Sequence, residues 1–91
     1  MLSIDFTGQY LKDLKLARRR NFDEQKLNEL LLTLIHEQVL PAKHKDYALS
    51  GDYKGFRECH IQPDWLLIYR IDTNLEILKL VRTGTHSDLF R

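Results

Sequence analysis

The chain has 91 residues, a formal net charge of +1 and a single cysteine. This length fits one domain, and a hydrophobic content of 43% with only four glycines and two prolines excludes a disordered chain. The lone Cys59 excludes an internal disulfide, so we expect it to pack as a small buried hydrophobe in a reducing compartment. No apolar stretch has the length of a membrane span, and no basic segment followed by an apolar core opens the chain. We therefore expect a single domain over residues 1–91, located in the cytoplasm.

The first part of the chain predicts one strand and two helices. Residues 2–6 alternate between apolar and polar side chains, as in a half-buried strand. Thr7 can cap a first helix, and Asp23 can cap a second. The apolar residues of 27–35 follow the spacing i, i+3, i+4, i+7, i+8 of an amphipathic helix. Because only a short connection joins the helices, we expect an antiparallel helical hairpin on one face of a sheet.

The second part of the chain predicts a polar loop over residues 39–52, followed by three strands. The strands are expected at residues 54–61, 65–71 and 75–82, and short turns separate them. Such turns make both connections hairpins, so the strands run antiparallel. The predicted fold class is α+β, in the order β-α-α-β-β-β, with an antiparallel sheet that carries the N-terminal helical hairpin.

This up-down-up arrangement brings separate polar segments to one edge of the sheet. The edge is predicted to hold His60, Asp64, Trp65 and Arg82, with His86 just beyond it. If the last hairpin is symmetric about Thr73, Asp64 lies opposite Arg82, although a slip of one residue would change which face each side chain occupies.

These residue types suit cleavage of RNA by its own 2′-hydroxyl. Histidine can take or give a proton near neutral pH, and arginine can hold a phosphate with two hydrogen bonds while opposing its growing charge. Asp64 could orient a histidine or act as a base itself. Trp65 and Phe90 offer aromatic faces on which bases could stack.

Other interpretations of the same residues stay open. Asp64 and Arg82 could form an ordinary cross-strand salt bridge, and Trp65 could belong to the core. A metal site built from His44, His60, Asp64 and His86 lacks histidine pairs at ligand spacing, so we predict neither a metal nor another cofactor. A non-catalytic domain that binds the ribosome or another partner is the main alternative to an enzyme.

Several segments of the chain form a more specific pattern than any single motif. They are Thr7-Gly8-Gln9-Tyr10, Lys45-Asp46, Lys54-Gly55-Phe56-Arg57, His60 to Trp65, Arg82 to His86, and Leu89-Phe90. In their order and spacing, the sequence resembles the YafQ branch of the RelE superfamily of bacterial toxins over nearly its whole length. The resemblance implies the compact RelE fold.

The resemblance also implies a function and a set of partners. It implies a toxin of a bacterial type II toxin–antitoxin system that acts as a ribosome-dependent endoribonuclease. The implied partners are a cognate antitoxin protein, the ribosome with its mRNA and, through the antitoxin complex, operator DNA. The resemblance assigns the positions of His60, Asp64, Trp65, Arg82, His86 and Phe90 to the active site. We expect His60, Asp64, Arg82 and His86 to be catalytic, together with the loop residue Tyr47, and Trp65, Phe90, Lys45, Lys54 and Arg57 to bind RNA.

The loop departs from the family pattern at one position. The family carries a histidine directly after the Lys-Asp pair, where this chain has Tyr47. Tyrosine can donate a hydrogen bond to a phosphate but is a poor base at neutral pH. His44 lies three residues earlier and could occupy the same space, so either residue could supply the contribution of the loop.

Overall fold

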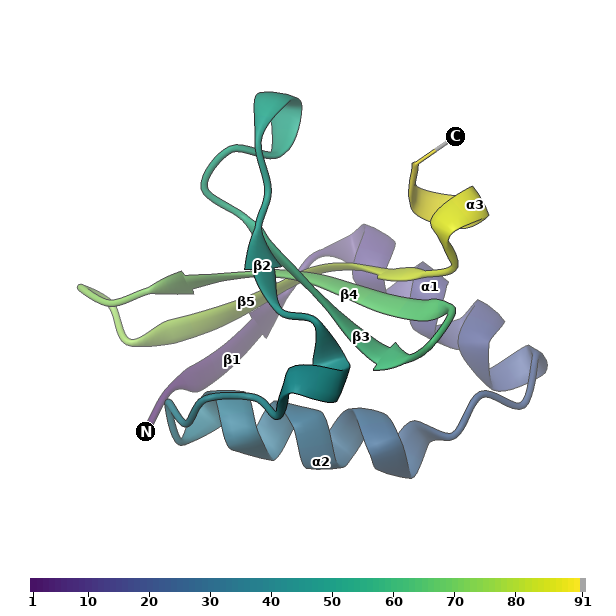
Figure 1. Ribbon diagram of the computed structural model, residues 1–91, viewed down its shortest axis with the longest axis horizontal. Coiled ribbons are helices and arrows are strands. Elements are labelled where there is room, and N and C mark those ends of the chain that lie inside the picture. The colour runs from purple at the N-terminus through teal and green to yellow at the C-terminus, as the bar shows by residue number, and fades with distance from the viewer. Residues whose placement is uncertain (91) are drawn as a thin grey trace.

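The computed structural model describes residues 1–90, which form one five-stranded sheet, two long helices and a short C-terminal helix (Figure 1). The strands are β1 (Ser3–Phe6), β2 (Tyr47–Ala48), β3 (Arg57–Gln62), β4 (Trp65–Asp72) and β5 (Ile77–Gly84). The helices are α1 (Gly8–Arg19), α2 (Glu24–Ile35) and α3 (His86–Leu89), with single 3-10 turns at Ala42–His44 and Gly51–Tyr53. No helix in this described part is long and apolar enough to cross a membrane.

The two long helices begin where the sequence predicts. The Thr7 side chain accepts a hydrogen bond from the Tyr10 N–H, and the Asp23 side chain accepts one from the Gln25 N–H. Asn21 adopts a positive φ of 59° between the helices, which breaks the helical backbone. Both predicted caps are therefore confirmed.

The sheet has the order β1-β5-β4-β3-β2, and the predicted α+β class is confirmed. β2 to β5 are antiparallel neighbours, whereas β1 pairs with β5 in parallel. The expectation of a fully antiparallel sheet is wrong for β1. No hairpin fixes the direction of β1, because the whole helical hairpin and three further strands separate it from β5.

The starts of two strands and the register of the last hairpin also differ from prediction. Gly55 has a φ of +94° and Glu76 a φ of 54°, so β3 and β5 begin later than expected. Arg82 lies opposite Ile68, because the register shifts between Ile68 and Tyr69. The predicted pairing of Asp64 with Arg82 is therefore wrong.

The two faces of the sheet have separate apolar clusters. The larger cluster combines both long helices with one face of the sheet; its most buried members include Tyr10, Leu27, Leu30, Cys59, Ile61, Trp65, Leu67 and Leu78. The smaller cluster centres on Leu66, Ile68 and Leu89, on the other face. Because side chains alternate along β3, Glu58 and His60 point away from the helices, and this arrangement creates the candidate site.

Candidate active site

His60, Asp64 and His86 meet at the end of the sheet where β3, β4 and β5 carry the predicted polar segments. The rings of His60 and His86 have centroids 5.6 Å apart. Asp64 Oδ1 lies 3.3 Å from His86 Nδ1 and accepts a hydrogen bond from the His86 main-chain N–H at 3.2 Å. These bonds hold the pKa of Asp64 below its usual value, the main-chain bond more than the ring. Asp64 is thus a carboxylate that orients His86 rather than a group ready to take a proton.

A buried carboxylate, Glu58, completes the other side of the site. Glu58 is 2% exposed, and its Oε1 accepts a hydrogen bond of 2.8 Å from the Tyr47 hydroxyl and lies 3.5 Å from His60 Nε2. On the other edge of its ring, His60 Nδ1 faces the Pro63 carbonyl at 3.1 Å. Both ring nitrogens of His60 therefore face oxygen acceptors, and an imidazolium can donate to both.

The sequence did not single out Glu58, although it carries a signal for it. Glu58 and His60 are two apart on a strand whose neighbours Cys59 and Ile61 are core residues. Strand alternation places the acid and the imidazole on the same face. A carboxylate that lies in the middle of a sheet is costly to bury unless it has a function or a partner.

The segment Arg82 to His86 is built to present His86 at the start of α3. Thr83 is buried and donates its hydroxyl to the Leu66 carbonyl at 2.7 Å. Thr85 and Asp88 form a reciprocal capping box at the start of α3. A Cβ on Gly84 would lie 3.0 Å from Asp88, so a larger residue there would push the cap aside. This segment therefore fixes the position of His86.

Asp88 gives a testable contribution to stability. Its bonds to Arg20 and to the Thr85 N–H lower its pKa from 3.8 to about 2, and its side chain is 23% exposed. Asp88→Asn should lower the free energy of unfolding by about 1–2 kcal/mol at neutral pH, after allowance for solvent screening. Because the folded pKa lies below the unfolded value, this stabilisation is present above about pH 4 and is lost as the pH falls through about 2. Urea unfolding of both proteins across this range measures it, and a difference that does not shrink in acid would contradict the assignment.

Aromatic side chains surround the exposed side of His86. The Phe90 ring lies 6.3 Å from the His86 ring and 6.0 Å from the Tyr53 ring, between centroids. Phe90 is 40% exposed, so part of its ring is open to contact with a base. Phe90 thus lies where a stacking residue would be needed.

The structure does not support stacking of RNA on Trp65. The indole is 1% exposed and packs against Phe22 with ring centroids 5.1 Å apart, inside the larger core cluster. The first residues of β4 are buried on both faces of the sheet, so Trp65 turns towards the helices rather than towards the edge. Its role is to pack the core beneath the site.

Arg82 lies apart from the histidines and is held by α1. Its Nε and Nη2 donate to the two carboxylate oxygens of Asp13, each at 3.0 Å, and this pair raises the pKa of Arg82. Asp13 also accepts from the Thr83 N–H at 3.2 Å. Nε and Nη2 of Arg82 can therefore hold a phosphate only if they exchange Asp13 for it.

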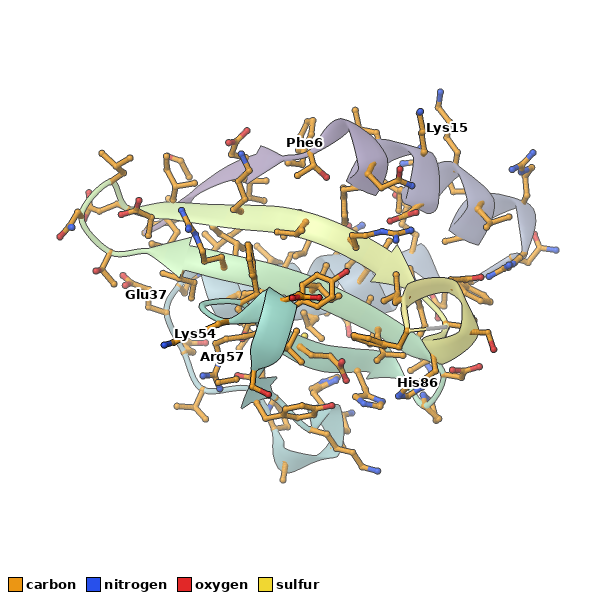
Figure 2. The ribbon with its side chains drawn as sticks, turned by 90° about the horizontal axis from the view of Figure 1, so that it is seen from above. Phe6, Lys15, Glu37, Lys54, Arg57 and His86 are labelled. Carbon is orange, nitrogen blue, oxygen red and sulfur yellow. The ribbon has the colours of Figure 1, made fainter. Side chains whose placement is uncertain are left out.

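The three basic residues that were predicted to bind RNA from outside the sheet edge do not lie together. Lys45 lines a cavity next to His60. Arg57 lies on the helix-facing side of β3, where its Nε donates to Asp46 at 3.2 Å, and Asp46 also accepts from the Tyr69 hydroxyl. Figure 2 shows Lys54 and Arg57 close to each other and well away from His86. The structure thus places Lys45 beside the site, but not Lys54 or Arg57. Arg57 instead anchors the Lys45-Asp46 loop to the sheet.

This arrangement of paired histidines and carboxylates sits on a fold that other proteins share. Residues 2–91 match the family described as "Bacterial toxin of type II toxin-antitoxin system, YafQ". The chain belongs to the YafQ family. It is 48% identical over 88 residues to the mRNA interferase toxin YafQ of Escherichia coli K12, with 96% of this chain and 94% of the relative covered. The YafQ resemblance of the sequence is thereby confirmed.

Solved structures agree with this membership. The Escherichia coli DinJ–YafQ complex contains a chain that superposes with a TM-score of 0.90 at 42% identity, and all of both chains is covered. A metal-bound toxin from Helicobacter pylori superposes with a TM-score of 0.93 at 44% identity, over 99% of this chain and 100% of that one. The YafQ fold therefore includes the sheet edge, the helical hairpin and the short C-terminal helix described above.

Within residues 1–90 of this YafQ-family chain, one group of three side chains could hold a metal ion. Glu58, His60 and His86 each offer a ligand atom, and the three atoms lie within 4.8 Å of one another. This set differs from the four residues weighed from the sequence, because Glu58 replaces His44 and Asp64. The same three groups are the ones available for proton transfer.

Proposed function

We propose that this mRNA interferase toxin cleaves mRNA on the ribosome by attack of the 2′-hydroxyl on the adjacent phosphate, with His60 and His86 as its acid and base. The observation that carries the proposal is the approach of two histidine–carboxylate pairs, His86 with Asp64 and His60 with Glu58, whose rings are 5.6 Å apart. The partners are the ribosome, its mRNA and a cognate antitoxin in the cytoplasm, and operator DNA is reached through the antitoxin complex.

The two histidines differ in the partners of their ring nitrogens. His86 Nδ1 faces Asp64, which leaves Nε2 to accept the proton of the 2′-hydroxyl, as in other histidines oriented by a carboxylate. His60 faces acceptors on both sides and can hold two protons, one of which it gives to the leaving 5′ oxygen. The bond from the 2′ oxygen to phosphorus forms as the bond to the 5′ oxygen breaks. The products are a 2′,3′-cyclic phosphate and a 5′-hydroxyl.

Phe90 and Arg82 serve the substrate rather than the proton transfers. Phe90 offers a partly exposed ring beside His86, and base stacking on an aromatic ring contributes about 1–3 kcal/mol. Arg82 stabilises the phosphate after it exchanges Asp13 for the substrate. The net charge of +1 gives little general attraction to RNA, and this favours a substrate presented by the ribosome over free RNA.

Expression in a bacterium tests the proposal. Expression without antitoxin should arrest growth and create new mRNA 5′ ends in the reading frame, and an inhibitor of translation should prevent the cuts. Co-expression of the adjacent small open reading frame should restore growth and yield a complex that copurifies. Undisturbed growth at verified expression, with no new 5′ ends, would favour the non-catalytic binding domain instead.

Tyr47 should make a modest contribution through Glu58. Its hydroxyl donates to Glu58, and that bond raises the pKa of Tyr47, so it stays protonated and cannot act as a base. Tyr47→Phe should slow single-turnover cleavage on programmed ribosomes by about 2- to 12-fold, the value of one neutral hydrogen bond. His44 Nδ1 instead bonds the main-chain carbonyl of His60 at 2.7 Å, on the far side from Glu58. A larger loss in His44→Ala than in Tyr47→Phe would show that His44 supplies the contribution of the loop.

Transition metals should inhibit the reaction rather than support it. Glu58, His60 and His86 cannot transfer protons while they coordinate an ion, because coordination uses the same lone pairs. Added Zn²⁺ or Cu²⁺ should therefore lower the cleavage rate, and phenanthroline, which spares the Mg²⁺ of the ribosome, should restore it. A preparation that loses activity in phenanthroline and regains it with Zn²⁺ would instead identify a metalloenzyme.

A further inference from the structure

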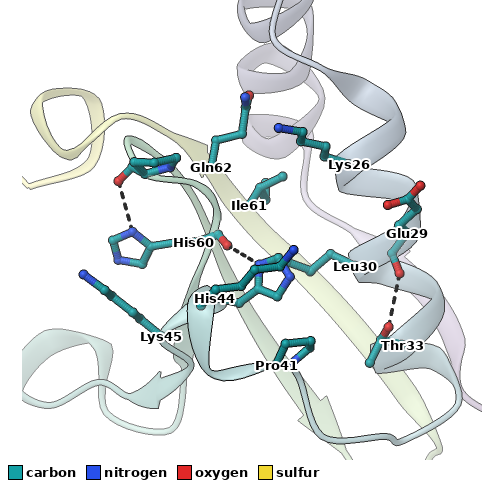
Figure 3. Close-up of a pocket in the computed structure, with 12 residues that line it drawn as sticks. Lys26, Glu29, Leu30, Thr33, Pro41, His44, Lys45, His60, Ile61 and Gln62 are labelled. Carbon is teal, nitrogen blue, oxygen red and sulfur yellow. Dashed lines mark hydrogen bonds between the residues drawn. The ribbon is translucent and has the colours of Figure 1, made fainter.

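A cavity of about 540 Å³ opens next to His60, between α2, the turn at Ala42–His44 and the end of β3 (Figure 3). Pro41, Leu30 and Ile61 give it an apolar floor, and Thr33 and Gln62 add polar groups. Its volume suits one nucleotide and is too small for a folded partner. His60 links this cavity to the candidate active site: its main-chain carbonyl accepts a hydrogen bond from His44 in the cavity wall, while its ring faces Glu58 and His86 on the other side of β3, so the two sites are separated only by the end of this strand.

The rim of the cavity concentrates positive charge. Lys26, Lys43 and Lys45 line it together with a single carboxylate, Glu29, so the formal excess is +2 with histidines neutral, against +1 for the whole chain. None of these lysines forms a salt bridge within residues 1–90. Lysines around an apolar surface are complementary to a nucleotide, whose phosphates are negatively charged and whose base has a flat face that can pack on apolar side chains.

Two side chains in the cavity can recognise the edge of a base. The Gln62 amide has a donor and an acceptor, and Gln62 lines the cavity from the end of β3, next to the turn that holds Asp64. His44 donates Nδ1–H to the His60 carbonyl, which leaves its Nε2 for a ligand and ties the cavity wall to the main chain of His60. Figure 3 shows His44 between the end of β3 and α2, whereas Lys45 extends towards the ring of His60.

We propose that this cavity is a nucleotide-binding subsite for the mRNA strand, which takes the base next to the cleaved phosphodiester while Lys26, Lys43 and Lys45 hold the flanking phosphates. The inference rests on the proposed function, because it assigns the cavity to the strand that the site cleaves. It makes Gln62 a determinant of which base is accepted beside the cut. An acidic antitoxin segment would also meet the lysines, but it would have no use for the amide and the flat floor so close to His60.

The test separates mRNA from ribosomal RNA and from antitoxin. Wild-type protein is bound to ribosomes programmed with a labelled mRNA that has a 2′-deoxy nucleotide at the cut and 4-thiouridine beside it, and photo-crosslinked peptides are mapped. Adducts on the labelled strand at Lys43, His44 or Gln62 are expected. Because the 2′-deoxy strand cannot be cleaved, this result does not depend on the catalytic proposal. If crosslinks form there and the normal strand is not cut, only the catalytic proposal fails.

Matched variants supply the second arm. In the double variant Lys26→Ala/Lys43→Ala, the slope of log KM for cleavage against log salt concentration should fall by about 1.4. This is the value for two phosphate contacts to a single strand. The control Lys12→Ala/Lys15→Ala removes the same charge from the exposed face of α1 and should change this slope less. Gln62→Ala should change the base preference beside the cut by about 2- to 12-fold while the cleaved bond stays the same.

Three results would overturn the inference. One is crosslinking to ribosomal RNA alone, and another is an equal effect of both lysine pairs. The third is a cavity variant that loses antitoxin binding while its KM and base preference stay unchanged.

Discussion

His86→Ala should lower the rate of mRNA cleavage by about 10²–10⁴ and abolish growth arrest, because it removes a group that transfers a proton in the transition state. His86 is exposed at the start of α3, and within residues 1–90 its ring hydrogen-bonds only the exposed Asp64, so the fold should lose little. Single-turnover cleavage on programmed ribosomes measures the rate, and circular dichroism with thermal unfolding verifies the fold.

His36→Ala is the matched control for this experiment. His36 is an exposed histidine at the C-terminal end of α2, where its ring bonds the Leu32 carbonyl, and it lies outside the candidate site. It should leave the rate unchanged. If His86→Ala cleaves as fast as wild type, the proton-transfer role of His86 is wrong and the two remaining groups, His60 and Glu58, must do the chemistry alone.

The sequence predicted the elements whose formation depends on neighbouring residues, above all the two long helices. The caps at Thr7 and Asp23 and the spacing of leucines in α2 identify both helices without reference to the rest of the chain. The convergence of His60, Asp64 and His86 also followed from topology, because two hairpins bring these strand ends together in any register. α3 was missed, although Thr85 and Asp88 have the spacing of a capping box.

Features that depend on distant contacts were not predictable in the same way. The shift at Ile68 moves Arg82 away from Asp64, and no local signal marks it. β4 is apolar at every position from Trp65 to Tyr69, so alternation could not say which face Trp65 takes. The capture of Arg82 by Asp13 joins residues 69 positions apart. These three differences explain why the predicted site contained two residues that the structure places elsewhere.

Glu58→Gln should lower the cleavage rate by about 10²–10⁴, which is the largest effect expected from a residue that the sequence pattern did not select. The neutral amide keeps the size of the side chain but removes the negative charge 3.5 Å from His60 Nε2. Loss of the carboxylate that supports a catalytic histidine costs up to about 10⁴ in serine proteases. Tyr47 can still donate to the amide oxygen, so the loop should stay in place.

The size of the loss distinguishes charge from packing at this position. Glu58→Gln should be at least as stable as wild type, because it no longer buries a carboxylate that is 2% exposed, and slow cleavage by a stable protein would assign the loss to charge. Glu37→Gln, at an exposed site after α2, removes the same charge and should be silent. Glu58→Asp keeps the charge but moves it away from His60 by the length of one methylene group, so its cleavage rate should lie between those of wild type and Glu58→Gln. If Glu58→Gln cleaves at the wild-type rate, the charge of Glu58 does not support His60. His60 then holds its second proton through the Pro63 carbonyl alone, and the acid of the reaction must be found among the groups that surround His86.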